Sequence, residues 1–176
     1  MTDFQIRPAK PTDAAQISSL ISTTWSHFFG YSVSPSDLAT YLSTTLSVNQ
    51  ISLDLANPSY NYTVIVPPHS STIAGVIQLV YDSTEPCLEG RAPIELRRLY
   101  VAEEYHGKGI AQLLMEAADA VGREKGCDTI WLGVWENNPR AERFYQKCGY
   151  DKRGEHWFMV GESKRRDWVM EKKLDP

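Results

Sequence analysis

An amphipathic segment between two apolar runs most constrains what this chain can fold into. Apolar residues between positions 110 and 121 recur at intervals of three and four, which predicts a helix with one buried face. This segment follows an apolar run at Ile94–Val101 and precedes another at Thr129–Trp135, which suits a strand covered on both faces. Two strands joined through a helix normally pair in parallel by a right-handed crossover. The sequence therefore predicts a parallel strand pair in an α/β fold.

The first strand of this pair changes phase in its middle. Ile94 and Leu96 alternate on one face, whereas the apolar residues from Leu99 onward fall on the opposite phase. A flip across Arg97 and Arg98 is typical of a β-bulge, which bends a strand away from its neighbour. We therefore expect a gap between the two parallel strands at their carboxyl ends, where ligands of open α/β sheets bind.

The remaining periodic segments extend the pair into a mixed sheet. The fold class is α/β: one domain with a central sheet of about six or seven strands, a splayed parallel pair and flanking helices. Helices are expected at 11–25, 34–46, 48–55 and 139–148, and further strands at 4–8, 60–66, 72–81, 152–159 and 168–174.

Charge is divided unevenly along the chain. The net charge is −4, from 18 basic and 22 acidic residues. Positions 1–90 hold two basic residues against seven acidic ones, whereas positions 91–176 hold sixteen against fifteen. The acidic total argues against a nucleic-acid partner, and no apolar stretch is long enough to span a membrane.

The cysteines and the N-terminus bear on the compartment. Cys87, Cys127 and Cys148 lack the spacing of metal ligands, and the first residues lack a secretory pattern. We therefore expect reduced thiols, a cytoplasmic protein and no bound metal.

A glycine-rich loop, residues 106–111, joins the bent strand to the amphipathic helix. Gly107 and Gly109 allow close backbone approach, and the free N–H groups and positive dipole end of the helix face the loop. Lys108 adds a positive charge. This combination favours an anion such as a pyrophosphate. The alternative interpretation is a strand-to-helix turn without a ligand, and the loop alone does not decide between them.

A second motif follows the strand at Thr129–Trp135. Asn138 is a natural helix N-cap, and Pro139 suits the first helical position. Tyr145 lies on an apolar stripe of this helix. It is either a core residue or, because it lies near the opening of the sheet, a proton donor.

Three segments in this order, Leu96–Val101, His106–Ala111 and Asn138–Tyr150, carry a resemblance to a known family. They resemble the motifs of the GNAT superfamily of N-acetyltransferases. In that family's loop pattern a Gln or Arg stands where this chain has His106, whereas Gly109 and Ala111 fit the pattern.

The resemblance implies acetyl-CoA as the acetyl donor and direct transfer to an amine. It implies that the loop binds the pyrophosphate and that the bent strand pairs with the pantetheine arm, where a backbone N–H polarises the thioester carbonyl. Tyr145 would protonate the departing thiolate. The implied donor-binding residues are Leu99, Tyr100, Val101, His106, Gly107, Lys108, Gly109, Ile110, Ala111, Asn138 and Tyr145.

A base must also take a proton from the amine. Glu95, on the bent strand, is the first candidate, and the alternative is a simple ion pair with Arg97 or Arg98. His106 and Glu136 are further options. For these two we favour a role in loop structure and a solvated loop carboxylate, respectively.

In the family, the two early helices form one wall of the acceptor site. Trp25, Phe28 and Glu136 are therefore the candidate acceptor-binding residues, with core packing as the alternative for the aromatic ones. We accordingly divide the domain into an acceptor-side half (1–90), an acetyl-CoA-binding core (91–150) and C-terminal strands (151–176). The negative charge of the first part would attract a cationic amine.

The expected acceptor is the primary amine of a small molecule. A looser resemblance, in the segments around Ser34–Tyr41 and Asp54–Pro58, points to the polyamine (spermidine/spermine) acetyltransferase branch. A protein N-terminus or lysine is the alternative acceptor, and a non-catalytic acyl-CoA-binding module is the alternative function. We expect a monomer or a homodimer.

Overall fold

A single seven-stranded sheet organises the chain in the computed structural model, which describes residues 4–175. The spatial order is β1-β2-β3-β4-β5-β7-β6, and every neighbouring pair is antiparallel except β4 and β5. The expected mixed sheet with one parallel pair is confirmed. The strands are β1 (Gln5–Pro8), β2 (Tyr60–Val66), β3 (Gly75–Val80), β4 (Pro93–Val101), β5 (Thr129–Trp135), β6 (Asp151–Val160) and β7 (Ser163–Lys173).

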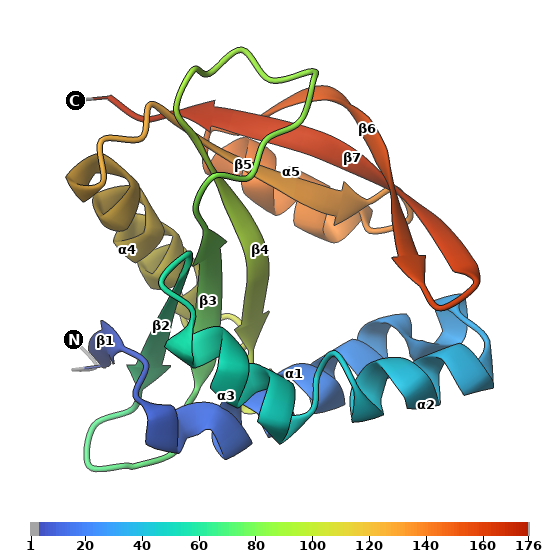
Figure 1. The fold of residues 1–176 in the computed structure, drawn as a ribbon. Helices are drawn as coiled ribbons and strands as arrows, with labels where there is room; N and C mark the ends of the chain where they lie inside the picture. The colour runs from blue at the N-terminus through green and yellow to red at the C-terminus, as the bar shows by residue number, and fades with distance from the viewer. Residues whose placement is uncertain (1–3, 176) are drawn as a thin grey trace.

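Within residues 4–175, five helices flank the sheet (Figure 1). Residues of α1 and α3 share one apolar cluster with Tyr62, Val64 and Val76, whereas α4 shares the other with Ile65 and Ile77. Successive side chains of β2 and β3 thus point to opposite faces of the sheet and contribute to both apolar clusters. The helices are α1 (Ala14–Phe29), α2 (Pro35–Ser43), α3 (Val48–Ala56), α4 (Ile110–Glu124) and α5 (Pro139–Lys147), with 3-10 turns at Pro11–Asp13, Gly30–Ser32 and Glu103–Tyr105.

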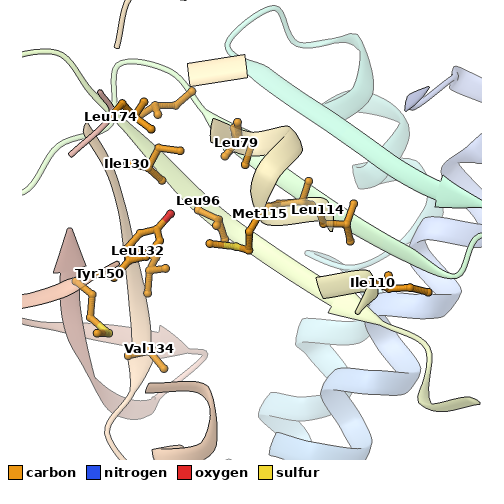
Figure 2. Packing of buried hydrophobic residues seen from close by; sticks show 14 of the residues in the cluster. Leu79, Leu96, Ile110, Leu114, Met115, Ile130, Leu132, Val134, Tyr150 and Leu174 are labelled. Carbon is orange, nitrogen blue, oxygen red and sulfur yellow. The ribbon is translucent and has the colours of Figure 1, made fainter. Parts of the chain in front are cut away.

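The α4 helix packs its apolar stripe against the middle of the sheet. Leu114 and Met115 are almost fully buried and lie in one cluster with Leu79 and Leu96 of the neighbouring strands (Figure 2). A Cβ at Gly75 would lie 3.0 Å from Leu114 Cδ1, so this glycine permits the close approach of helix and strand. This packing fixes where the N-terminus of α4 points.

The expected bulge lies where the phase flip predicted it. Gln78 of β3 faces Arg98, but its neighbour Leu79 faces Leu96, which leaves Arg97 as the extra residue of β4. Within the described residues, β4 then pairs with β5 only over Pro93–Glu95, and the two strands diverge beyond that point (Figure 1). The gap between the parallel strands is therefore confirmed.

The C-terminal hairpin is longer than expected. The last strand, predicted to begin at Trp168, begins at Ser163, because Ser163 already pairs with Val160 of β6. The five added residues are Ser, Lys, Arg, Arg and Asp, so no apolar pattern marked them as a strand. This extension places Arg165 and Asp167 on a strand beside the gap.

None of the helices described within residues 4–175 is both long enough and apolar enough to cross a membrane.

Candidate active site

The bent end of β4 leaves one strand edge without a partner in the sheet. Leu99, Tyr100 and Val101 pair with β3 on one side, and on the other side β5 has already turned away. Their outward N–H and C=O groups form the kind of edge to which an extended ligand adds as a strand. The edge ends at the glycine-rich loop.

The loop at 106–111 has the backbone that the sequence suggested. Gly107 and Gly109 have φ values of 75° and 77°, a left-handed conformation that other residues avoid. Gly109 is the N-cap of α4, and its carbonyl accepts a hydrogen bond from Leu113 N–H. The N–H groups that begin α4, including those of Ile110 and Ala111, have no intrahelical acceptor and can bind an anion.

His106 connects the loop to the strand edge. Its Nε2 lies 2.9 Å from the carbonyl oxygen of Val101, and its ring stacks on Phe28 with centroids 6.0 Å apart. Lys108 extends over the ring of Tyr105. Phe28, expected at the acceptor, therefore lies against the loop that would hold the donor's phosphates.

An open cavity of about 930 Å³ occupies the space between the diverging strands. Its walls come from β2, β4, β5, the helices α1, α2, α3 and α5, the loop between β3 and β4, and the β6–β7 hairpin. The structure brings six of the expected site residues to its lining, and these are Trp25, Glu95, Leu99, Tyr100, Asn138 and Tyr145. The loop residues 106–111, Phe28 and Glu136 lie outside this lining.

Tyr145 reaches the cavity from α5. Asn138 caps this helix by accepting the N–H of Ala141 at 3.1 Å, and Pro139 is its first residue, as predicted. The ring of Tyr145 packs edge-on against Phe144 and Tyr150. Burial raises the pKa of the Tyr145 hydroxyl above its ordinary range, so this group remains protonated at neutral pH.

The two carboxylates proposed from the sequence both have partners. Glu95 pairs with Arg97 at 2.8 Å and accepts the Ser83 hydroxyl at 2.7 Å. Glu136 accepts the Nε and Nη2 groups of Arg166 and lines a separate, smaller pocket. Of the two, only Glu95 faces the large cavity.

Sequence reasoning missed an imidazole between two carboxylates in the same cavity. His156 Nδ1 lies 2.8 Å from Glu85 Oε1, and its Nε2 lies 4.0 Å from Asp167 Oδ2. Burial raises the pKa of Asp167 above its ordinary range. Glu85 comes from a loop 71 residues before His156, so no local spacing in the sequence could have revealed the arrangement.

Arg165 also lines the cavity but was not among the expected site residues. It follows an exposed lysine in a run of polar residues, a pattern that is typical of a solvated surface. Within residues 4–175 we find no cluster of three or more His, Cys, Asp or Glu side chains arranged to hold a metal ion.

The chain is similar to N-acetyltransferases along its whole length. The uncharacterized N-acetyltransferase in the pepI 3′ region of Lactobacillus delbrueckii subsp. lactis is 29% identical over 175 residues, which is 99% of both chains. The spermine/spermidine N(1)-acetyltransferase of Bacillus subtilis is 34% identical, but over only 61 residues, which is 34% of this chain and 40% of that one. The expected polyamine branch therefore has only partial support.

The fold is shared with solved acetyltransferase structures. The PaiA N-acetyltransferase from Thermoplasma acidophilum, crystallised in complex with coenzyme A, superimposes with a TM-score of 0.76 at 22% identity. The match covers 97% of this chain and 99% of that one. The acetyltransferase (GNAT) family model matches residues 23–150, which include the bent strand, the glycine-rich loop and the Tyr145 helix. The chain therefore belongs to the acetyltransferase (GNAT) family of N-acetyltransferase enzymes.

Proposed function

We propose that this protein transfers the acetyl group of acetyl-CoA directly to the primary amine of a small molecule. The observation that carries the proposal is the continuity of the site. A free strand edge at Leu99–Val101 leads from the positive-φ loop to a cavity that contains the protonated Tyr145. A thioester bound along this edge would have its phosphates at the start of α4 and its acetyl group in the cavity.

The residues present fit acetyl-CoA. The loop N–H groups and Lys108 suit the pyrophosphate, the β4 edge suits the pantetheine amides, and Asn138 lines the cavity that the acetyl end would enter. A backbone N–H on this edge is in position to stabilise negative charge on the thioester oxygen. Phe28 would support this donor-side wall through His106, whereas Trp25 lies on the acceptor side.

The transfer itself needs one acid and one base. The amine nitrogen forms a bond to the acetyl carbon, the bond from that carbon to sulfur breaks, and the nitrogen gives up a proton. Tyr145, which is protonated at neutral pH, supplies the proton that the departing thiolate takes. Solvent then restores the proton of Tyr145.

Two side chains in the cavity qualify as the base. Glu95 lies on β4, the strand that carries the bent edge, but both its oxygens are engaged: Oε1 accepts from Arg97 and Oε2 accepts from Ser83 and Arg97. Because an ionised Glu85 carboxylate can only accept a hydrogen bond, we assign the proton between Glu85 and His156 to Nδ1. The other nitrogen, Nε2, which lies 4.0 Å from Asp167 Oδ2, is then the one that can accept a proton. We favour His156, because a carboxylate orients it in the manner of other catalytic imidazoles.

The size of the cavity favours a small acceptor. A volume of about 930 Å³ lies within the range of small-molecule sites. Polyamines are the particular acceptors suggested by the partial match to the Bacillus subtilis enzyme. A protein N-terminus or lysine is the second class of acceptor. The three cysteines are unpaired, which fits our proposal of a cytoplasmic enzyme, acting as a monomer or a homodimer.

Release of free CoA thiol tests the proposal. Acetyl-CoA is incubated with the protein and a panel of polyamines, arylamines, amino sugars, amino acids and peptides, and each product is identified by mass spectrometry. We expect thiol release with at least one small amine, with a gain of 42 mass units on that amine, about the mass an acetyl group adds. If coenzyme A binds and no amine elicits turnover, the protein is a non-catalytic acyl-CoA-binding module instead.

A further inference from the structure

Arg165 is a buried cation that forms no salt bridge within residues 4–175. It lies on β7, lines the cavity and is only 7% exposed. Its Nε and Nη1 atoms are buried and have no hydrogen-bond acceptor among residues 4–175. Buried charges are normally paired, because moving a charged group out of water is strongly unfavourable unless a partner compensates for the lost hydration. The burial also lowers the pKa of Arg165, although guanidinium groups remain charged in proteins.

Aromatic rings hold this guanidinium in place. Its Cζ lies 4.4 Å from the ring centroid of Trp135, 5.3 Å from that of Phe29 and 5.6 Å from that of Trp25. Ring faces stabilise a cation, but they do not replace the oxygen acceptors that its N–H groups require. The rings therefore fix the position of the charge and leave its buried Nε and Nη1 groups without an oxygen acceptor.

Asp167 presents the opposite charge on the same face of the same strand. It is 9% exposed, and its Oδ1 is buried without a donor among the residues that the structure describes. Arg165 and Asp167 form no ion pair with each other within the described chain, although they are two residues apart. Arg165 and Asp167 thus each keep a buried polar group without a hydrogen-bond partner, and the second Asp167 oxygen, Oδ2, lies 4.0 Å from His156 Nε2.

The other charged side chains of the cavity already have partners. Arg97 pairs with Glu95, and the imidazole of His156 pairs with Glu85. Arg98 likewise bonds to the Asp54 carboxylate across a buried network. Among the charged side chains that line the cavity, only Arg165 and Asp167 therefore keep buried polar atoms without a hydrogen-bond partner in residues 4–175.

We propose that the acceptor is an amino acid with a free carboxylate, which Arg165 binds while Asp167 holds the amine beside His156. This inference rests on the proposed acetyltransferase function and narrows its substrate class. A zwitterion satisfies both unpaired groups at once, since the guanidinium bonds to the carboxylate and Asp167 accepts from the amine. A polyamine has no anionic group for Arg165 and would bring a further cation next to it.

Matched acceptors separate these possibilities. We compare kcat/KM for free amino acids with that for the corresponding amino-acid amides, and compare lysine with cadaverine. Each pair differs in the carboxylate. We expect the wild-type enzyme to favour the carboxylate-bearing member on the order of 10- to 100-fold, the usual value of a hydrogen bond to a charged group.

Variants of Arg165 test whether this residue causes the preference for acceptors that bear a carboxylate. Arg165→Met should abolish that preference, mainly by raising KM for the acceptor, and Arg165→Lys should retain part of it. KM for acetyl-CoA should stay within about twofold, because the loop and strand edge that would bind the donor are unchanged. Lys164→Met, which removes the neighbouring exposed charge outside the cavity, is the matched control and should keep the preference. Circular dichroism and affinity for coenzyme A verify that each variant folds.

Three outcomes would overturn the proposal. Turnover of amides and diamines at rates equal to or above those of the carboxylates would refute the substrate class and leave the acetyltransferase function standing. A rise in KM for acetyl-CoA in Arg165→Met and Arg165→Lys would assign Arg165 to the donor instead. Absence of thiol release with every amine, despite binding of coenzyme A, would refute the proposed function itself.

Discussion

Gly133 of β5 lies against the imidazole of His156. A Cβ at position 133 would stand 2.8 Å from His156 Nε2 and 3.3 Å from Asp167 Oδ2. The first distance is shorter than real Cβ contacts, so any larger residue would have to displace the imidazole. Glycine at this position of an otherwise bulky apolar strand therefore keeps room for His156 beside the cavity.

Gly133→Ala should impair catalysis without unfolding the protein. The methyl group would push the imidazole away, and a misplacement of about 1 Å can lower a catalysed rate by about 10²-fold. We expect kcat to fall while the melting temperature and the affinity for acetyl-CoA change little. Steady-state kinetics together with thermal unfolding would measure this. A normal kcat in a variant with a verified alanine would show that the position of His156 does not matter to the reaction.

The base can be assigned by comparing two substitutions. His156→Gln should lower kcat by about 10²- to 10⁴-fold, the usual contribution of a general base, whereas Glu95→Gln should have a much smaller effect. The profile of kcat/KM against pH should lose its acidic limb only in the variant that lacks the base. The reverse pattern would assign the role to Glu95, as the sequence first suggested.

Tyr145→Phe tests the acid. Removal of the hydroxyl should lower kcat by about 10²- to 10⁴-fold and leave KM for acetyl-CoA nearly unchanged. Because burial raises the pKa of Tyr145, the wild-type rate should show no loss from ionisation of this hydroxyl up to about pH 10, the ordinary tyrosine value.

Tyr150→Phe is the matched control for that experiment. The Tyr150 hydroxyl is buried and has no partner among residues 4–175, so its removal should keep the rate. An unchanged turnover in Tyr145→Phe would remove Tyr145 from the acid role.

The architecture could be predicted because its determinants are local. The helical period after Gly109, the phase flip at Arg97 and the N-cap at Asn138 each depend on a few neighbouring residues, and the structure has all three. Such patterns reflect burial of one face and satisfaction of helix ends.

The side of the cavity that we propose for the acceptor could not be predicted in the same way. His156 meets Glu85 only because the β6–β7 hairpin folds back across the gap, and Arg165 lies in a polar run that resembles a solvated surface. Their burial depends on contacts between distant segments, and periodicity carries no information about those. The proposed donor site, by contrast, is built from one continuous strand, loop and helix.

A buried polar network behind the bulge should be important for stability. Arg98 Nη1 lies 2.9 Å from the Tyr62 hydroxyl and 3.3 Å from Asp54 Oδ2, and all three side chains are buried. Asp54→Ala would leave the guanidinium unpaired and should lower the free energy of unfolding by about 3 kcal/mol. Urea unfolding would measure the loss. The double variant Asp54→Ala/Arg98→Met should recover part of it, and failure to recover any would mean that the pair is not coupled.

The ion pair between Arg7 and Asp13 should make stability depend on pH. The Arg7 guanidinium, 2.7 Å from Asp13 Oδ2, and the Lys10 backbone N–H hold the pKa of Asp13 below its ordinary range. Since the unfolded carboxyl titrates near about 3.9, the stabilisation is fully present above that pH and is lost as the pH falls through the lower folded value. Asp13→Asn should therefore cost about 1–2 kcal/mol at pH 7, and the cost should shrink as the pH falls below the unfolded value and through the folded one. Urea unfolding across this range would measure the difference, and a cost that persisted in acid would assign it to packing rather than to the ion pair.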